Sequence, residues 1–117
     1  MAPVKLNISV RKINAKTGIL DVQGEVTGSA ESTLMDAYTQ ATAAGAQAVI
    51  LNFTGLEYMN SSGIGLLVTL LIRTQRQKQR LLAFGLSEHY QQIFELTQLD
   101  KAIGIYPAEA EALAAAG

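Results

Sequence analysis

The residues best suited to chemistry lie together in the segment Asn60-Ser61-Ser62-Gly63, near the middle of the chain. Asn and Ser favour the N-cap of a helix, where a side-chain oxygen accepts a hydrogen bond from a free backbone N–H. A hydroxyl at such a position also lies beside the positive end of the helix dipole. Capping alone would account for these residue types. Their concentration in one short segment nevertheless makes it the candidate functional site.

Apolar residues on both sides of this segment predict the elements that position it. The run from Ala48 to Phe53 is typical of a strand covered on both faces, and Thr54-Gly55 is expected to end that strand. After the polar segment, apolar residues recur at the spacing of an α-helix, at Ile64, Leu67, Val68 and Leu71. The order strand, loop, helix would place the hydroxyls at a helix N-terminus.

Length and composition limit the classes to which the chain can belong. Its 117 residues, 49% of them hydrophobic, predict one compact domain over residues 1–117. A formal net charge of -1 argues against nucleic-acid binding, and the absence of cysteine excludes disulfides and thiolate chemistry. The first residues lack a signal-peptide pattern, and no apolar run approaches the roughly 18 residues of a membrane span. We therefore expect a soluble cytoplasmic protein that is not inserted in a membrane.

The remaining periodicity predicts an α/β fold with a mixed central sheet of four to five strands and about four helices. Alternating apolar residues from Leu6 to Val10 and from Ile19 to Val22 predict an N-terminal hairpin that ends at Gly24. Residues 29–44 have the pattern of an amphipathic helix. Residues 81–84 predict a strand parallel to the strand at 48–53, joined to it by a right-handed crossover.

Two further helices are expected after that strand. Ser87 would cap the first, and Pro107 would open the second with its ring in the first turn. The first of these helices is expected to point its apolar residues inward: Tyr90, Ile93, Phe94 and Leu96.

No pattern typical of an enzyme or a metal site is present. His89 has no second ligand at a suitable spacing and is expected on the surface. Ser61 and Ser62 lack a G-x-S-x-G elbow, and Gly63-Ile64-Gly65 lacks the pattern of a phosphate-cradling loop. The basic run from Arg73 to Arg80 is interpreted as a solvated helix end. We therefore expect neither catalysis nor a cofactor.

Three segments together resemble the STAS domains, most closely the bacterial anti-sigma factor antagonists. These are LNFTGLEYMNSSGIG at 51–65, GEVT at 24–27 and IFELTQLDKAIGIY at 93–106, so that the resemblance covers nearly the whole chain. It implies the STAS fold, with Ser61 as the residue that a partner kinase phosphorylates. Where the family has Asp, this chain has Asn60 and Thr27.

The resemblance implies a function by partner switching. The unphosphorylated domain would bind an anti-sigma factor that is a serine kinase of the GHKL type and would free a sigma factor. Phosphorylation of Ser61 would end the binding, and a serine phosphatase would restore it. The residues expected to surround the phosphoacceptor are Asn60, Ser62 and Gly63, and those expected to contact the partner are Glu25, Thr27, Tyr58, Met59, Ile64 and Gly65.

Several alternatives remain open at this stage. Loss of the charge at Asn60 and Thr27 favours a constitutive docking subunit, as in a stressosome-like assembly or a lipid-transport complex, that is never phosphorylated. A small-molecule or nucleotide sensor is a third possibility. Ser62 lies in the same turn as Ser61 and competes with it as acceptor. Neither the partner nor the oligomeric state follows from the sequence.

Overall fold

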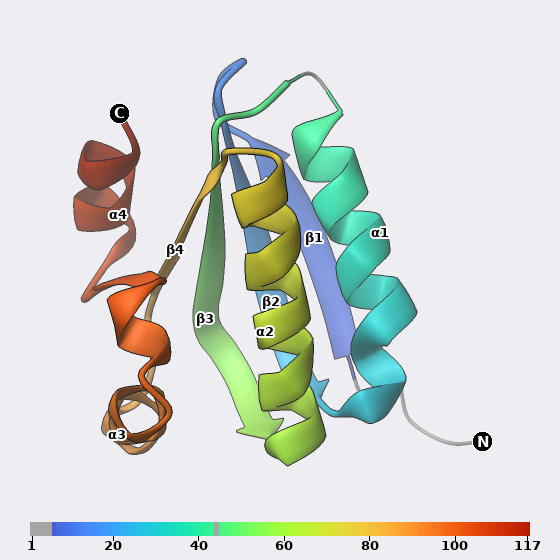
Figure 1. Ribbon diagram of the computed structural model, residues 1–117, viewed down its shortest axis with the longest axis vertical. Coiled ribbons are helices and arrows are strands. Elements are labelled where there is room, and N and C mark those ends of the chain that lie inside the picture. The colour runs from blue at the N-terminus through green and yellow to red at the C-terminus, as the bar shows by residue number, and fades with distance from the viewer. Residues whose placement is uncertain (1–5, 44) are drawn as a thin grey trace.

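The computed structural model describes residues 6–43 and 45–117 and contains one five-stranded sheet packed by helices (Figure 1). Strands lie in the order β1-β2-β3-β4-β5, with β1 antiparallel to β2 and every other pair parallel. The predicted α/β fold, N-terminal hairpin and parallel central strands are therefore confirmed. The elements are β1 (Leu6–Lys12), β2 (Thr17–Val26), the 3-10 turn η1 (Gly28–Ala30), α1 (Glu31–Thr42), β3 (Ala48–Met59), α2 (Ser61–Arg76), β4 (Arg80–Phe84), α3 (Glu88–Leu96), the 3-10 turn η2 (Leu99–Lys101), β5 (Gly104–Tyr106) and α4 (Glu109–Ala116).

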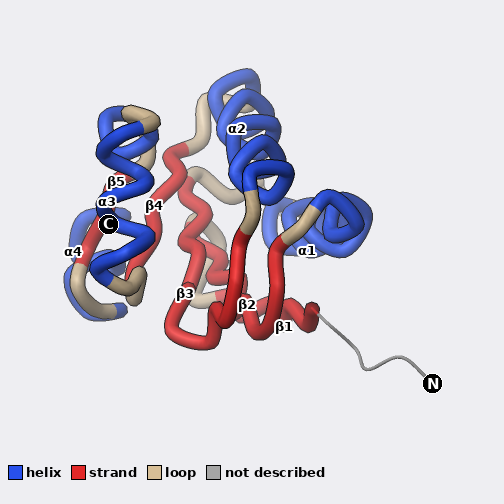
Figure 2. Tube along the Cα trace, turned by 90° about the horizontal axis from the view of Figure 1, so that it is seen from below, coloured by secondary structure: helices blue, strands red, loops and turns tan. Residues whose placement is uncertain are grey.

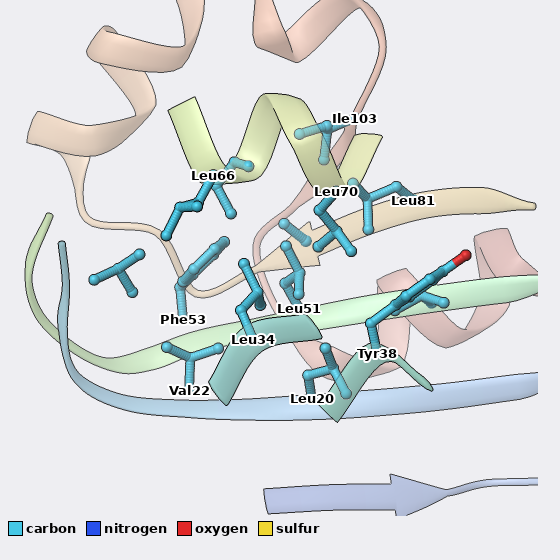
Figure 3. Close-up of a cluster of buried hydrophobic side chains, with 14 of the residues drawn as sticks. Leu20, Val22, Leu34, Tyr38, Leu51, Phe53, Leu66, Leu70, Leu81 and Ile103 are labelled. Atoms are coloured by element: carbon cyan, nitrogen blue, oxygen red, sulfur yellow. The ribbon is translucent and has the colours of Figure 1, made fainter. Parts of the chain in front are cut away.

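Helices cover the two faces of the sheet unequally. Figure 2 shows α1 and α2 side by side on one face, and Figure 3 shows the main core between these helices and the sheet. Leu51, Leu67 and Leu70 are almost fully buried there. On the opposite face α4 packs its buried Ala112 against a smaller cluster that includes Ile50 and Phe84. The larger core thus fixes α2, the helix that follows the candidate site.

Strands β2 and β3 run further than the sequence predicts. The hairpin strand does not end at Gly24 but continues through Val26, and Thr54-Gly55 does not end β3, which continues through Met59. Gly55 lies in a tight part of the sheet, because a Cβ there would approach the Gln23 Cγ to 2.9 Å. The register between β2 and β3 also shifts close to this point. Gly55 therefore allows β2 and β3 to approach closely where their pairing is irregular. In the sequence, the same glycine is mistaken for the end of a strand.

Helix faces and ends also differ in part from the expectation. The buried side of α2 consists of Gly63, Leu66, Leu67, Leu70 and Thr74, whereas Val68, one of the apolar residues at helical spacing, is 38% exposed. In α3, Phe94 is buried as expected, but Leu96 is 84% exposed. The last helix begins at Glu109, so Pro107 lies before its first turn. The cap of α3 is confirmed, since the Ser87 hydroxyl accepts a hydrogen bond from the Tyr90 N–H.

A polar network lies beside α4 on the same face of the sheet. The Arg11 guanidinium donates to Asp21 on β2 at 2.6 and 2.8 Å and to Glu109 of α4 at 2.8 Å. Asn52 on β3 donates to the same Asp21 carboxylate at 2.7 Å. The hydrogen bonds from Arg11 are the main reason that the pKa of Asp21 is held below its ordinary value. This network ties β1, β2, β3 and α4 together.

Candidate functional site

Asn60 joins β3 to α2 and caps the helix. Its backbone is extended, with φ -97° and ψ -176°, and its Oδ1 accepts a hydrogen bond from the Gly63 N–H at 2.9 Å. Its carbonyl oxygen accepts the first helical hydrogen bond, from Ile64 at 3.0 Å. Of the free N–H groups in the first turn, the one at Gly63 is thereby satisfied. The helix start predicted at residues 60–62 is confirmed.

The end of β2 packs directly against this first turn. The Asn60 N–H donates to the Val26 carbonyl at 3.3 Å, and the sheet pairs Val26 with Met59. A Cβ at Gly63 would collide with the Val26 carbonyl oxygen and would approach the Met59 Cγ to 2.9 Å. Gly63 is therefore required by the close contact between helix and strand. Residues 24–27, one of the segments that carry the resemblance, thus lie beside the polar segment, and residues 24–26 belong to β2.

The two serines of the segment differ in their surroundings. Both are exposed, and neither hydroxyl forms a hydrogen bond within the described part of the chain. Ser62 faces η1: its Cβ lies 3.4 Å from the position that a Cβ on Gly28 would occupy. Ser61 is the first residue of α2 and is exposed.

An uncharged stripe runs along the exposed side of α2 from Ser61. It consists of Ser61, Gly65, Val68 and Ile72, which recur at helical spacing and are all exposed. Val68 and Ile72 are 38% and 44% exposed, and a Cβ on Gly65 would meet no other atom within 4 Å. No residue from Tyr58 to Ile72 carries a charge. We call these four residues the α2 stripe; the apolar pattern of the helix contains it, but only the structure shows that this side is uncovered.

The other predicted contact residues are divided between the surface and the core. Tyr58 is 48% exposed, whereas Met59, which was expected to be exposed, is only 5% exposed and belongs to the main core. Burial follows because the extended β3 turns the Met59 side chain toward α2. Its backbone N–H donates to the Tyr90 hydroxyl at 2.8 Å, a contact from α3 that no sequence pattern indicates.

Strand β2 and η1 supply the remaining predicted residues. Glu25 is half-buried and pairs in register with Tyr58. Thr27 follows β2, and its hydroxyl lies 3.0 Å from that of Ser29. Ile64 is half-buried beside the main core. The structure therefore brings Glu25, Thr27, Tyr58 and Ser61 to one end of the sheet, where β2 and β3 end and α1 and α2 begin (Figure 1).

Two further features of the described residues bear on the class of protein. None of their helices is both long and apolar enough to cross a bilayer. Their His, Asp and Glu side chains do not gather in groups of three that could hold a metal ion. His89 is exposed, as expected, with its ring against that of Tyr90.

Comparison with known protein families identifies the architecture. The family model described as the STAS domain matches residues 7–112, which is most of the chain. This chain belongs to the STAS family. Comparison with curated protein sequences finds no significant match.

Solved structures of anti-sigma factor antagonists share the fold of this STAS domain. The antagonist from Mycobacterium paratuberculosis superposes with a TM-score of 0.82 at 21% identity, over 98% of this chain and 97% of that one. Unphosphorylated SpoIIAA gives a TM-score of 0.74 at 20% identity, over 92% and 93% of the two chains. Phosphorylated SpoIIAA of Bacillus gives 0.71 at 21% identity, over 93% and 98%.

Proposed function

We propose that this STAS domain is an anti-sigma factor antagonist that acts by partner switching, and that it is not itself an enzyme. In the cytoplasm, its unphosphorylated form binds an anti-sigma factor that is also a serine kinase of the GHKL type, and a sigma factor is released. That kinase phosphorylates Ser61, which ends the binding, and a serine phosphatase reverses the modification. The proposal is supported by the membership of the STAS family and by the names of the structures that share the fold.

The observation that carries the proposal is the position of the Ser61 hydroxyl. It is exposed at the first residue of α2, has no internal hydrogen-bond partner within the described residues, and opens the uncharged α2 stripe. A kinase can therefore reach the hydroxyl without unfolding the segment. The stripe, together with Glu25, Thr27, Tyr58 and Ile64, provides the surface on which the partner would rest.

Phosphorylation would change the complex rather than the fold. A phosphate carries about -1.5 to -2 charges, and the free N–H groups and the positive end of α2 stabilise such an anion. The same anion would be the only charge between residues 58 and 72. Burying it in an interface without a matching cation costs several kcal/mol, and each 1.4 kcal/mol is about tenfold in affinity. One modification is thus enough to separate the bound from the free state.

Asn60 is expected to slow phosphoryl transfer to Ser61. Its Oδ1 is occupied by the Gly63 N–H, so the group that remains is the amide Nδ2, which can only donate hydrogen bonds. An Asp in the same conformation would cap with one oxygen and keep the other to accept the proton of the Ser61 hydroxyl. The substitution Asn60→Asp therefore keeps the helix cap and adds a group that can accept the proton of Ser61.

Phosphorylation assays on three variants test the proposal. With the partner kinase and ATP, Asn60→Asp should raise the rate of phosphorylation by about tenfold or more, as expected for general-base assistance. Ser61→Ala should abolish phosphorylation, while the matched Ser62→Ala should preserve it. An unchanged rate in Asn60→Asp would contradict the role of Asn60.

The same assays examine the second candidate function, a docking subunit that is never phosphorylated. This alternative is favoured by the neutral Asn60 beside the acceptor. A stoichiometric partner complex that ATP leaves intact, together with no phosphate on wild-type or Asn60→Asp protein, would establish the alternative and exclude switching.

A further inference from the structure

A hollow of about 630 Å³ lies at the far end of α2 from Ser61. It is formed by the last turn of α1, residues 45–47 before β3, the turn that follows α2 and the first residue of β4, at the upper end of Figure 1. A smaller hollow of about 260 Å³ between Tyr38, Arg73 and Arg76 adjoins it and shares Tyr38 and Gln77 with it. The combined space falls in the range of small-molecule sites, roughly 300–1,000 Å³.

Cations line both hollows. Among the described residues, the lining includes Arg73, Arg76, Lys78 and Arg80 but no Asp or Glu. Arg80 donates to the Ala115 carbonyl at 2.6 Å, whereas the other three form no ion pair within the described part of the chain. The C-terminal ends of α1 and α2 each carry a partial charge of about -0.5, which offsets part of the charge of the four cations. Roughly three positive charges remain in excess. That excess attracts an anion bearing several charges.

Partly buried hydrogen bonds hold the wall of the larger hollow in place. The Tyr38 hydroxyl donates to the Gln79 Oε1 at 2.6 Å, and the Gln79 Nε2 donates to the Ala46 carbonyl at 3.2 Å. Tyr38 is only 5% exposed, and burial raises the pKa of its hydroxyl, which remains protonated. The wall is therefore already ordered before a ligand binds. Binding avoids the entropic cost of ordering it, which lowers affinity at flexible sites.

Lys78 occupies a backbone conformation that favours glycine. Its φ is 57°, in the left-handed region, directly after the C-cap Gln77 of α2. Glycine is the usual residue at this position because it avoids the steric cost of a Cβ. Lys78 adopts this conformation despite that cost, and it is one of the residues that line the hollow.

We propose that the two adjoining hollows together bind a small soluble molecule that carries several phosphate charges. The concave shape favours a compact ligand over a flat membrane surface, and the excess of unpaired cations favours a polyphosphate over a single weak anion. The site shares no residue with the Ser61 surface. Its test is therefore independent of the proposed partner switching.

Titration of the ¹⁵N-labelled protein with inorganic tripolyphosphate, followed by NMR, tests this site directly. At about 0.15 M salt, where exposed charges are largely screened, we expect saturable shifts in the amides of Gln47 and of residues 77–80. Arg76→Gln and Lys78→Gln should each weaken binding by roughly tenfold. Lys101→Gln is the matched control, because it removes the same charge from an exposed position outside the hollow, and its affinity should match that of the wild type.

Three results would overturn the proposal. The first is the absence of saturation by tripolyphosphate at this salt concentration. The second is an equal loss of affinity in Lys101→Gln, which would show a general charge effect. The third is binding to vesicles that contain phosphatidylserine without binding to tripolyphosphate, which would assign the cations to a membrane surface. Thermal unfolding of each variant establishes that the fold is retained.

Discussion

The two ends of α2 carry opposite kinds of surface although one continuous helix joins them. At the N-terminal end, Asn60, Ser61 and the α2 stripe are polar or apolar but uncharged, and the strand end at Val26 packs closely below. At the C-terminal end, four cations line the two adjoining hollows. The middle of the helix is fixed in the core by Leu67 and Leu70. The fold thus determines where each end lies, while the residues at the ends are free to carry function.

The largest effect on stability should come from the two glycines at the N-terminal end. Gly63→Ala places a Cβ against the Val26 carbonyl, and we expect the free energy of unfolding to fall by about 3 kcal/mol. Gly65→Ala adds the same atom into open space and should raise it by about 0.5–1 kcal/mol, because alanine is the better helix former. Urea denaturation measures both. Equal changes in the two variants would contradict the close contact at Gly63.

Substitutions at the two ends of α2 should differ in their effect on partner affinity. Ser61→Asp places a carboxylate in the uncharged stripe, and we expect partner affinity to fall by about 2–3 kcal/mol, or roughly a hundredfold. Arg76→Gln, at the other end of the same helix, should leave that affinity unchanged. Calorimetry with the purified anti-sigma factor gives both values. A similar loss in the two variants would place the partner surface elsewhere.

A smaller effect should follow from removal of the cap at Asn60. Asn60→Ala leaves the Gly63 N–H without its acceptor and should lower the free energy of unfolding by about 1 kcal/mol. Asn60→Asp keeps the acceptor and adds a charge that the helix dipole stabilises, so it should be at least as stable as the wild type. Thermal unfolding compares the three proteins. Loss of stability in Asn60→Asp would show that the amide has a structural role of its own.

The smallest expected effect is on stability at acidic pH. It arises from Asp21 in the sheet and not from either end of α2. The pKa of Asp21 is held below its ordinary value by Arg11, so its contribution to stability is present above about pH 4 and is lost as the pH falls through the lowered pKa. Asp21→Asn should therefore lose less stability than the wild type between neutral pH and acid. Urea denaturation at a series of pH values measures the difference, and parallel pH curves would exclude the Arg11–Asp21 pair as the source.

The sequence predicts most of the elements because their signals are local. The caps at Asn60 and Ser87 and the alternation of the hairpin require only neighbouring residues, and each is found. The errors arise where contacts between segments distant in sequence determine the structure. Gly55 belongs to a sequence pattern typical of a turn but lies in close contact with Gln23 within the sheet, and Leu96 follows the helical pattern but is 84% exposed.

The candidate site is only partly predictable for the same reason. Its segment and its cap follow from residue types, whereas the burial of Met59 depends on how far β3 extends. The difference between Ser61 and Ser62 depends on Gly28, which belongs to another part of the chain. The two hollows are formed by the end of α1, residues 45–47, the end of α2 and the turn that leads into β4, so the basic run alone does not predict them.

The most direct test of partner switching is the phosphorylation state of the protein isolated from its native cells. Intact mass, followed by peptide mapping across Phe53 to Arg73, should find a phosphate on Ser61 in the pool that is free of partner and none in the bound pool. Absence of phosphate under several growth and stress conditions, with a bound partner still recovered, would contradict switching and establish a constitutive docking subunit.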